Sequence, residues 1–198
     1  MYLKRVTITG FKTFADTTVI EFGQEVTSVI GPNGCGKSNI VDSIRWALGE
    51  QSAKSLRGAE MVDVIFNGSS SRRPAPYCDV CLVIDNGDKS LPIDSAEVAI
   101  RRKLHQNGQG EYYINDNPCR LRDVRELFMD TGLGAKTNTV IEQSQLNRLL
   151  EASSKERKVL IEEAAGISRF RRRRQESIAK LDRVKENNTR LQDIINEV

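Results

Sequence analysis

The stretch Gly31-Pro-Asn-Gly-Cys-Gly-Lys37-Ser38 fits the phosphate-binding pattern G-x-x-x-x-G-K-[ST] at every position. In such a loop the glycines let backbone N–H groups turn toward an anion, and the following helix directs the positive end of its dipole at the same point. The lysine reaches the β- and γ-phosphates of a nucleotide, and the last hydroxyl binds Mg²⁺. The stretch therefore predicts a nucleotide site with Lys37 as a phosphate ligand and Ser38 as a metal ligand.

The sequence on either side of this loop favours the same interpretation. An apolar run from Val26 to Ile30 predicts a buried strand that enters the loop, and the apolar spacing from Ile40 to Leu48 predicts a helix that leaves it. The alternative is a glycine-rich turn that only starts a helix. A complete pattern in a strand–loop–helix context argues against that alternative.

The rest of the first 130 residues predicts more strands than helices. Alternating apolar residues between Val6 and Phe22 predict two antiparallel strands ahead of the loop, and one helix is expected at 121–129. Asn-Gly and Asn-Pro turn signals separate the later strands, which indicates an antiparallel meander rather than βαβ units. The expected fold class is therefore α/β with a mixed (α+β) sheet. The later strands are expected at 61–66, 77–85, 96–104 and 111–114.

The end of the chain has a different pattern. Ser153-Ser-Lys-Glu156 has the spacing of a capping box, so a helix is expected to begin there and to divide the chain into domains at 1–152 and 153–198. Apolar residues and one asparagine then recur at steps of three and four, which is typical of a coiled coil that continues beyond the chain. An amphipathic helix packed on its own domain is the alternative. The seam consists of Leu181, Val184, Asn188, Leu191, Ile195 and Val198.

Composition restricts the location and the partners. The net charge is only +3, and no apolar run approaches the length that spans a bilayer, so we expect a cytoplasmic protein without a membrane partner. Four cysteines are expected to be free thiols, because one of them, Cys35, lies inside the phosphate loop. Cys78 and Cys81 have the spacing of zinc ligands but lack a second pair. Five arginines within Arg169–Arg174 indicate a polyanion partner, with a solvated helix face as the alternative.

Several separate stretches together resemble the N-terminal head segment of prokaryotic SMC (structural maintenance of chromosomes) proteins. The resemblance covers essentially the whole chain. It is carried by Leu3-x-x-Val-x-Ile-x-Gly-Phe-Lys-Thr-Phe14, the loop with Ser38-Asn39, Trp46-Ala-Leu-Gly-Glu-Gln51, Ser55-Leu-Arg-Gly58, Asp63-Val-Ile-Phe-Asn-Gly68 and Ile161-Glu-Glu-Ala-Ala-Gly-Ile167.

This resemblance implies half of an ABC-type ATPase head that uses ATP and Mg²⁺. It implies as partners the C-terminal half of the same head, a second head that dimerises around ATP, a kleisin-type subunit and double-stranded DNA at the nucleoid. Gln143 matches the Q-loop glutamine that holds Mg²⁺ and the attacking water, although Ser144 follows it where the family usually has glycine. Lys12 and Arg57 match cations near the nucleotide. The remaining nucleotide contacts are expected from Gly31, Pro32, Asn33, Gly34, Cys35, Gly36, Lys37, Ser38 and Asn39, with Lys37 and Gln143 acting in catalysis.

Two parts of an ABC site are missing from the sequence. Asp85 ends an apolar strand as a Walker B acid does, but it runs into the turn signal Asn86-Gly87 and no glutamate follows it. No Leu-Ser-Gly-Gly segment occurs either. We therefore expect that the isolated chain does not hydrolyse ATP. The alternatives are a DNA-repair ATPase of the RecF or RecN type and a structural coiled-coil DNA-binding module with vestigial nucleotide binding.

Overall fold

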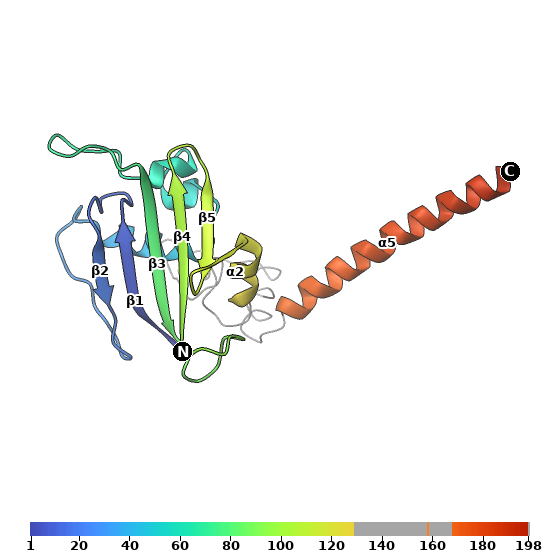
Figure 1. Ribbon diagram of the computed structural model, residues 1–198, viewed down its shortest axis with the longest axis horizontal. Coiled ribbons are helices and arrows are strands. Elements are labelled where there is room, and N and C mark those ends of the chain that lie inside the picture. Colours follow the sequence, from blue (N-terminus) through green and yellow to red (C-terminus); the bar gives the residue numbers. More distant parts are fainter. Residues whose placement is uncertain (129–157, 159–167, 198) are drawn as a thin grey trace.

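The computed structural model describes residues 1–128, 158 and 168–197. Its main feature is a six-stranded antiparallel sheet with the order β2-β1-β3-β4-β5-β6, seen face-on in Figure 1. Every neighbouring pair is antiparallel, and the later strands from β3 to β6 lie beside one another in chain order, which confirms the predicted meander for these strands. The strands are β1 Tyr2–Thr9, β2 Thr18–Glu21, β3 Tyr77–Asp85, β4 Glu97–His105, β5 Gly110–Ile114 and β6 Asn117–Cys119.

Helices cover one face of this sheet. Helix α1 (Lys37–Ala47) packs against β3 and β4, and α2 (Leu121–Leu127) packs against β5. The core between them contains Trp46, Val80 and Ile100, all fully buried. Since alternate strand residues point to opposite faces, the other side of β3 and β4 carries polar side chains such as Asp79 and Arg101. The sheet therefore has one apolar, fully buried face and one more polar face that is partly exposed.

Two short 3₁₀ helices follow α1, η1 (Lys54–Leu56) and η2 (Met61–Val64). The prediction of a strand at 61–66 was wrong. The Asp63 carboxylate accepts hydrogen bonds from the backbone N–H groups of Ala59 and Glu60, each at 2.8 Å, and this closes the chain into a turn. Only Ile65 keeps a strand-like contact, a single bridge to Phe11.

The prediction of a buried strand at Val26 to Ile30 was also wrong for this chain. The segment forms no strand, and Val26 and Ile30 are 95% and 91% exposed. A strand needs a hydrogen-bonding neighbour, and the described strands of the sheet all pair with one another instead.

Helix α5 (Ser168–Glu197) runs away from the sheet domain in Figure 1. Its predicted seam is solvent-exposed: Leu181, Val184, Leu191 and Ile195 are each more than half exposed. Arg174 is exposed as well. Among the described residues, no helix has the length and apolar character needed to cross a membrane.

Candidate functional site

The phosphate loop, residues 31–38, leads directly into α1. Its backbone is left-handed at Gly34 and Gly36, where φ is +84° and +98°, and Gly36 is the residue that caps the helix. A Cβ atom at Gly36 would lie 2.9 Å from Oγ1 of Thr13 in the loop after β1. Both the backbone angle and the close approach of Thr13 therefore require glycine at this position.

The N-terminal end of α1 is open to an anion. Among the residues that the structure describes, no side chain caps this end, and the first turn contains no acidic residue. The N–H groups and the positive dipole end of the helix therefore point into the loop without a competing carboxylate. This is the arrangement that a phosphate group needs.

A cavity of about 260 Å³ lies in front of this helix end. Its polar lining suits a phosphate chain and a hydrated cation better than an apolar ligand. Every lining residue belongs to the set predicted from the sequence. These residues are Asn33, Gly34, Gly36, Lys37, Ser38, Asn39 and Arg57.

Lys37 folds back over the loop. Its ammonium donates hydrogen bonds of 2.6 Å to the carbonyl oxygens of Gly31 and Pro32 and lies 3.8 Å from Sγ of Cys35. These three predicted residues thus hold the lysine rather than line the cavity. Two neutral carbonyls are weaker partners for an ammonium than a phosphate, so an arriving phosphate can draw the side chain into the cavity.

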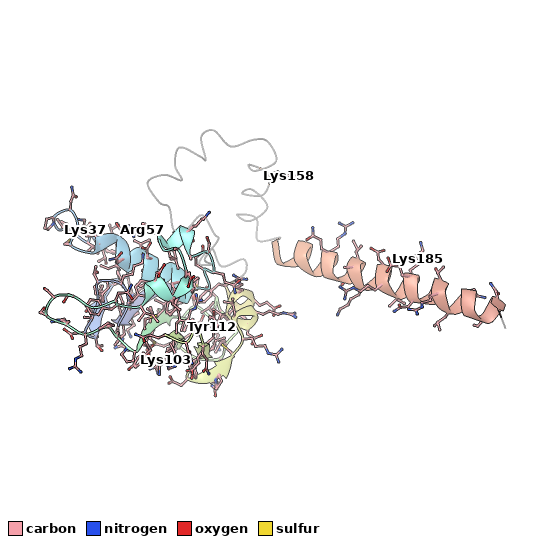
Figure 2. The ribbon with its side chains drawn as sticks, turned by 90° about the horizontal axis from the view of Figure 1, so that it is seen from above. Lys37, Arg57, Lys103, Tyr112, Lys158 and Lys185 are labelled. Atoms are coloured by element: carbon pink, nitrogen blue, oxygen red, sulfur yellow. The ribbon has the colours of Figure 1, made fainter. Side chains whose placement is uncertain are left out.

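A second cavity, of about 470 Å³, adjoins the first and shares Asn39 and Arg57 with it. Lys12, Thr13 and Ile65 are among the other residues that line this cavity. The predicted cation Lys12 is therefore close to the loop but outside the phosphate cavity. Figure 2 shows Lys37 and Arg57 at the same end of the domain, far from Lys103 and Tyr112.

Two residues of this region were missed from the sequence. Thr13 accepts a hydrogen bond of 3.0 Å from the Asn39 side chain and packs on Gly36. Asp42 of α1 is 4% exposed and forms ion pairs with both Lys12 and Arg57. An acidic residue on the core-facing side of an amphipathic helix was the available signal for Asp42, because a buried carboxylate needs a cation.

Two other predicted positions lie elsewhere. Gln143 falls outside the described residues. Asp85, at the end of β3, accepts a hydrogen bond of 3.2 Å from the Gly87 backbone and lines neither of the two cavities. Of the cysteines, Cys35 is exposed, and burial raises the pKa of Cys78 to about 12. The described residues contain no group of three or more His, Cys, Asp or Glu side chains that could hold a metal ion.

The antiparallel sheet, the phosphate loop and α1 together form the N-terminal lobe of an ABC-type ATPase head. A model of the RecF/RecN/SMC N terminal domain family matches residues 2–137. The chain belongs to this family.

Within this family, the relatives and solved structures that the chain resembles are SMC proteins and their head domains. The chain is 48% identical over 198 residues to the chromosome partition protein Smc of Desulfitobacterium hafniense, covering all of this chain and 16% of that protein. It is similar to the Smc head domain of Pyrococcus furiosus with an extended coiled coil, solved bound to the C-terminal domain of ScpA. That match has a TM-score of 0.80, 30% identity, and covers 99% of this chain and 50% of the other.

A further similar structure is described as "Structural biochemistry of ATP-driven dimerization and DNA stimulated activation of SMC ATPases". It has a TM-score of 0.72 and 31% identity, and the match covers 82% of this chain and 99% of the other. The resemblance to an SMC head segment is thereby confirmed. The chain spans about one sixth of the length of the curated relatives that it matches.

Proposed function

We propose that this chain is the ATP-binding half of an SMC head, which works in chromosome condensation and segregation by driving DNA entrapment. The observation that carries the proposal is the polar cavity at the uncapped N-terminus of α1, lined by Lys37, Ser38 and Arg57. A phosphate chain in that cavity would meet the helix dipole, several backbone N–H groups and two cations at once.

Each loop residue has a separate role in this proposal. Backbone N–H groups between Asn33 and Lys37 bind the phosphate oxygens, and Lys37 leaves the carbonyls of Gly31 and Pro32 to contact the β- and γ-phosphates. Ser38, exposed in the same cavity, would offer its hydroxyl to Mg²⁺. Gln143, which matches the Q-loop glutamine, would supply a second metal contact and orient the attacking water. When bound, Mg²⁺ neutralises charge on the phosphate oxygens.

The proposed head has two parts within this chain, the lobe at 1–152 and the start of the coiled coil at 153–198. Two exposed apolar surfaces support the proposal that a C-terminal half completes the head. The run from Val26 to Ile30 needs a strand neighbour, and the seam from Leu181 to Ile195 needs a helix partner. That half would also supply the Walker B acid, the catalytic glutamate and the signature segment, so the isolated chain is proposed to be inactive as an ATPase.

The remaining partners are proposed from the relatives. A second head would close the site across the γ-phosphate, a kleisin-type subunit would bind as ScpA does to the similar head structure, and double-stranded DNA would stimulate turnover. Such a protein would act in the cytoplasm at the nucleoid.

The deciding experiment is calorimetry of ATP binding, with and without Mg²⁺, to the reconstituted head, meaning this chain combined with a separately expressed C-terminal half. Lys37→Ala should weaken binding at least tenfold, or about 1.4 kcal/mol. Unchanged affinity in Lys37→Ala would overturn the phosphate site at Lys37. No binding by the unmodified head would overturn the proposal in favour of a structural module with vestigial nucleotide binding.

A further inference from the structure

Asp42 joins two cations that come from distant parts of the chain. Its Oδ2 atom lies 2.5 Å from the ammonium of Lys12 and also accepts a bond from the guanidinium of Arg57. Asp42 belongs to α1, Lys12 lies in the loop after β1, and Arg57 is the C-cap residue that follows η1. One carboxylate thus ties both loops to the helix that begins at the phosphate loop.

The two loops present their cations from unusual backbone conformations. Lys12 and Arg57 are both left-handed, with φ of 49° and 60°, although neither is glycine. Backbone hydrogen bonds hold each of them: Lys12 N–H donates to Val64 at 2.7 Å, and Arg57 N–H donates to Lys54 at 3.0 Å. Such conformations persist where the surrounding structure fixes them, and they cluster at functional sites.

The two ion pairs have different physical consequences. The Lys12 side chain is 12% exposed and also donates to the carbonyl of Leu56 at 2.6 Å, so it needs Asp42 to compensate for its burial. The Arg57 side chain is 56% exposed and would be well solvated without any partner. An ion pair with such an exposed cation adds little stability. The ion pair between Asp42 and Arg57 instead fixes the direction in which the Arg57 side chain points.

That direction is toward the two cavities, both of which Arg57 lines. Asp42 lines neither cavity, and it lies five residues into the helix, about 7 Å along the axis from Lys37. Its carboxylate therefore stays away from a bound phosphate while it holds one edge of the guanidinium. The other N–H groups of Arg57 are left to face an anion, since a guanidinium has five.

We propose that Asp42 is a positioning residue of the nucleotide site, which holds Arg57 beside the phosphate cavity so that its charge is in place during turnover. This inference rests on the proposed ATPase function. A positioning role differs from a purely structural role in one respect. If Asp42 acts by positioning Arg57, then losing Asp42 should slow turnover only when Arg57 is present.

The test measures kcat and KM for ATP in the reconstituted head at a temperature well below its melting midpoint. Asp42→Asn should lower kcat about fivefold and change KM less than about twofold. The double variant with Arg57→Ala should be no slower than Arg57→Ala alone, because the two residues act as a unit. Asp94→Asn, which removes the same charge from an exposed pair with Lys89, is the matched control and should leave both constants unchanged.

A second variant guards against loss of folding. Asp42→Glu keeps the charge that Lys12 needs but moves the carboxylate by one methylene, so it should fold and still lower kcat. Three outcomes would overturn the inference and leave Asp42 with a role in the core alone. The first is an unchanged kcat in a folded Asp42 variant, and the second is a double variant in which the two losses of kcat multiply. The third is failure of both Asp42 substitutions to fold. Failure of the unmodified head to bind or hydrolyse ATP would instead refute the proposed function.

Discussion

The guanidinium carbon of Arg102 in β4 lies 4.4 Å from the ring centroid of Trp46 in α1. The same guanidinium donates hydrogen bonds of 2.8 Å to the carbonyl oxygens of Trp46 and Glu50, and its carbon lies 5.0 Å from the ring centroid of Tyr112. A buried cation therefore binds the carbonyl end of the helix whose amide end forms the phosphate site. This arrangement fixes α1 on the sheet, since the negative end of the helix dipole favours a cation.

Arg102→Ala should accordingly destabilise the protein by about 2–4 kcal/mol, because it leaves a cavity and removes a donor from two carbonyls. The Glu50 carbonyl loses its Arg102 donor, whereas that of Trp46 keeps the Gly49 N–H at 3.0 Å. Urea unfolding followed by circular dichroism measures this loss. Lys103→Ala is the control: Lys103 is the neighbouring residue on the solvated face, 4.3 Å from the Tyr77 ring, and its removal should cost less than about 1 kcal/mol. Equal losses in the two variants would contradict the anchoring role of Arg102.

Cys35 offers a chemical probe of the loop. Its thiol is exposed and lies beside Lys37, so alkylation at pH 8 should modify it, and Mg²⁺–ATP should slow that reaction at least about tenfold by covering the loop. Burial raises the pKa of Cys78 to about 12, so its reactive thiolate becomes abundant only near that pH and it should stay unmodified at pH 8. Mass spectrometry of labelled peptides distinguishes the sites, with Cys35→Ser as the control. Equal labelling of Cys35 with and without nucleotide would argue against a bound nucleotide at the loop.

The basic cluster of Arg169–Arg174 should bind DNA through phosphate contacts. Charge reversal at Arg172 and Arg173 should weaken double-stranded DNA binding and reduce the salt dependence by about two units of slope, because each lost contact removes about one. Fluorescence anisotropy across a salt series measures both effects. Reversal at Lys185 and Arg190, further along α5, is the control. If the salt dependence of DNA binding is unchanged in the cluster variant, these arginines form a solvated helix face instead of a DNA-binding site.

Turnover should require both halves of the head. The chain alone should not hydrolyse ATP. With the C-terminal half present, the rate of ATP hydrolysis should rise more steeply than first order in head concentration. The same rate should fall more than about tenfold in Ser38→Ala and in Gln143→Ala. Phosphate release across a concentration series tests this. A rate that is first order in the chain and indifferent to the C-terminal half would overturn the split site and restore Asp85 as a Walker B acid.

Local sequence signals were sufficient for the loop and the meander. The loop pattern requires glycine at position 36, where the backbone is left-handed. The Asn-Gly turns and the alternating apolar residues specify β3, β4 and β5 to within about a residue at each end. The turn at Met61–Val64 was missed because the hydrogen bonds of Asp63 to preceding N–H groups overrode the apolar pattern. The core-facing position of Asp42 signals a buried carboxylate that needs a cation. Its two partners could not be identified in the same way, because they come from separate loops and no local pattern encodes their approach.

The exposed run from Val26 to Ile30 has a consequence for handling the chain as a separate molecule. Residues 26–30 form no backbone–backbone hydrogen bond within the described part of the chain, and three of them, Val26, Val29 and Ile30, expose apolar side chains. Such a segment is a template for intermolecular β-pairing. The segment that leads into the phosphate loop can therefore pair with a second copy of the chain until a neighbouring strand covers it. Light scattering of the purified chain should rise with concentration and time, and co-expression with the C-terminal half should suppress that self-association.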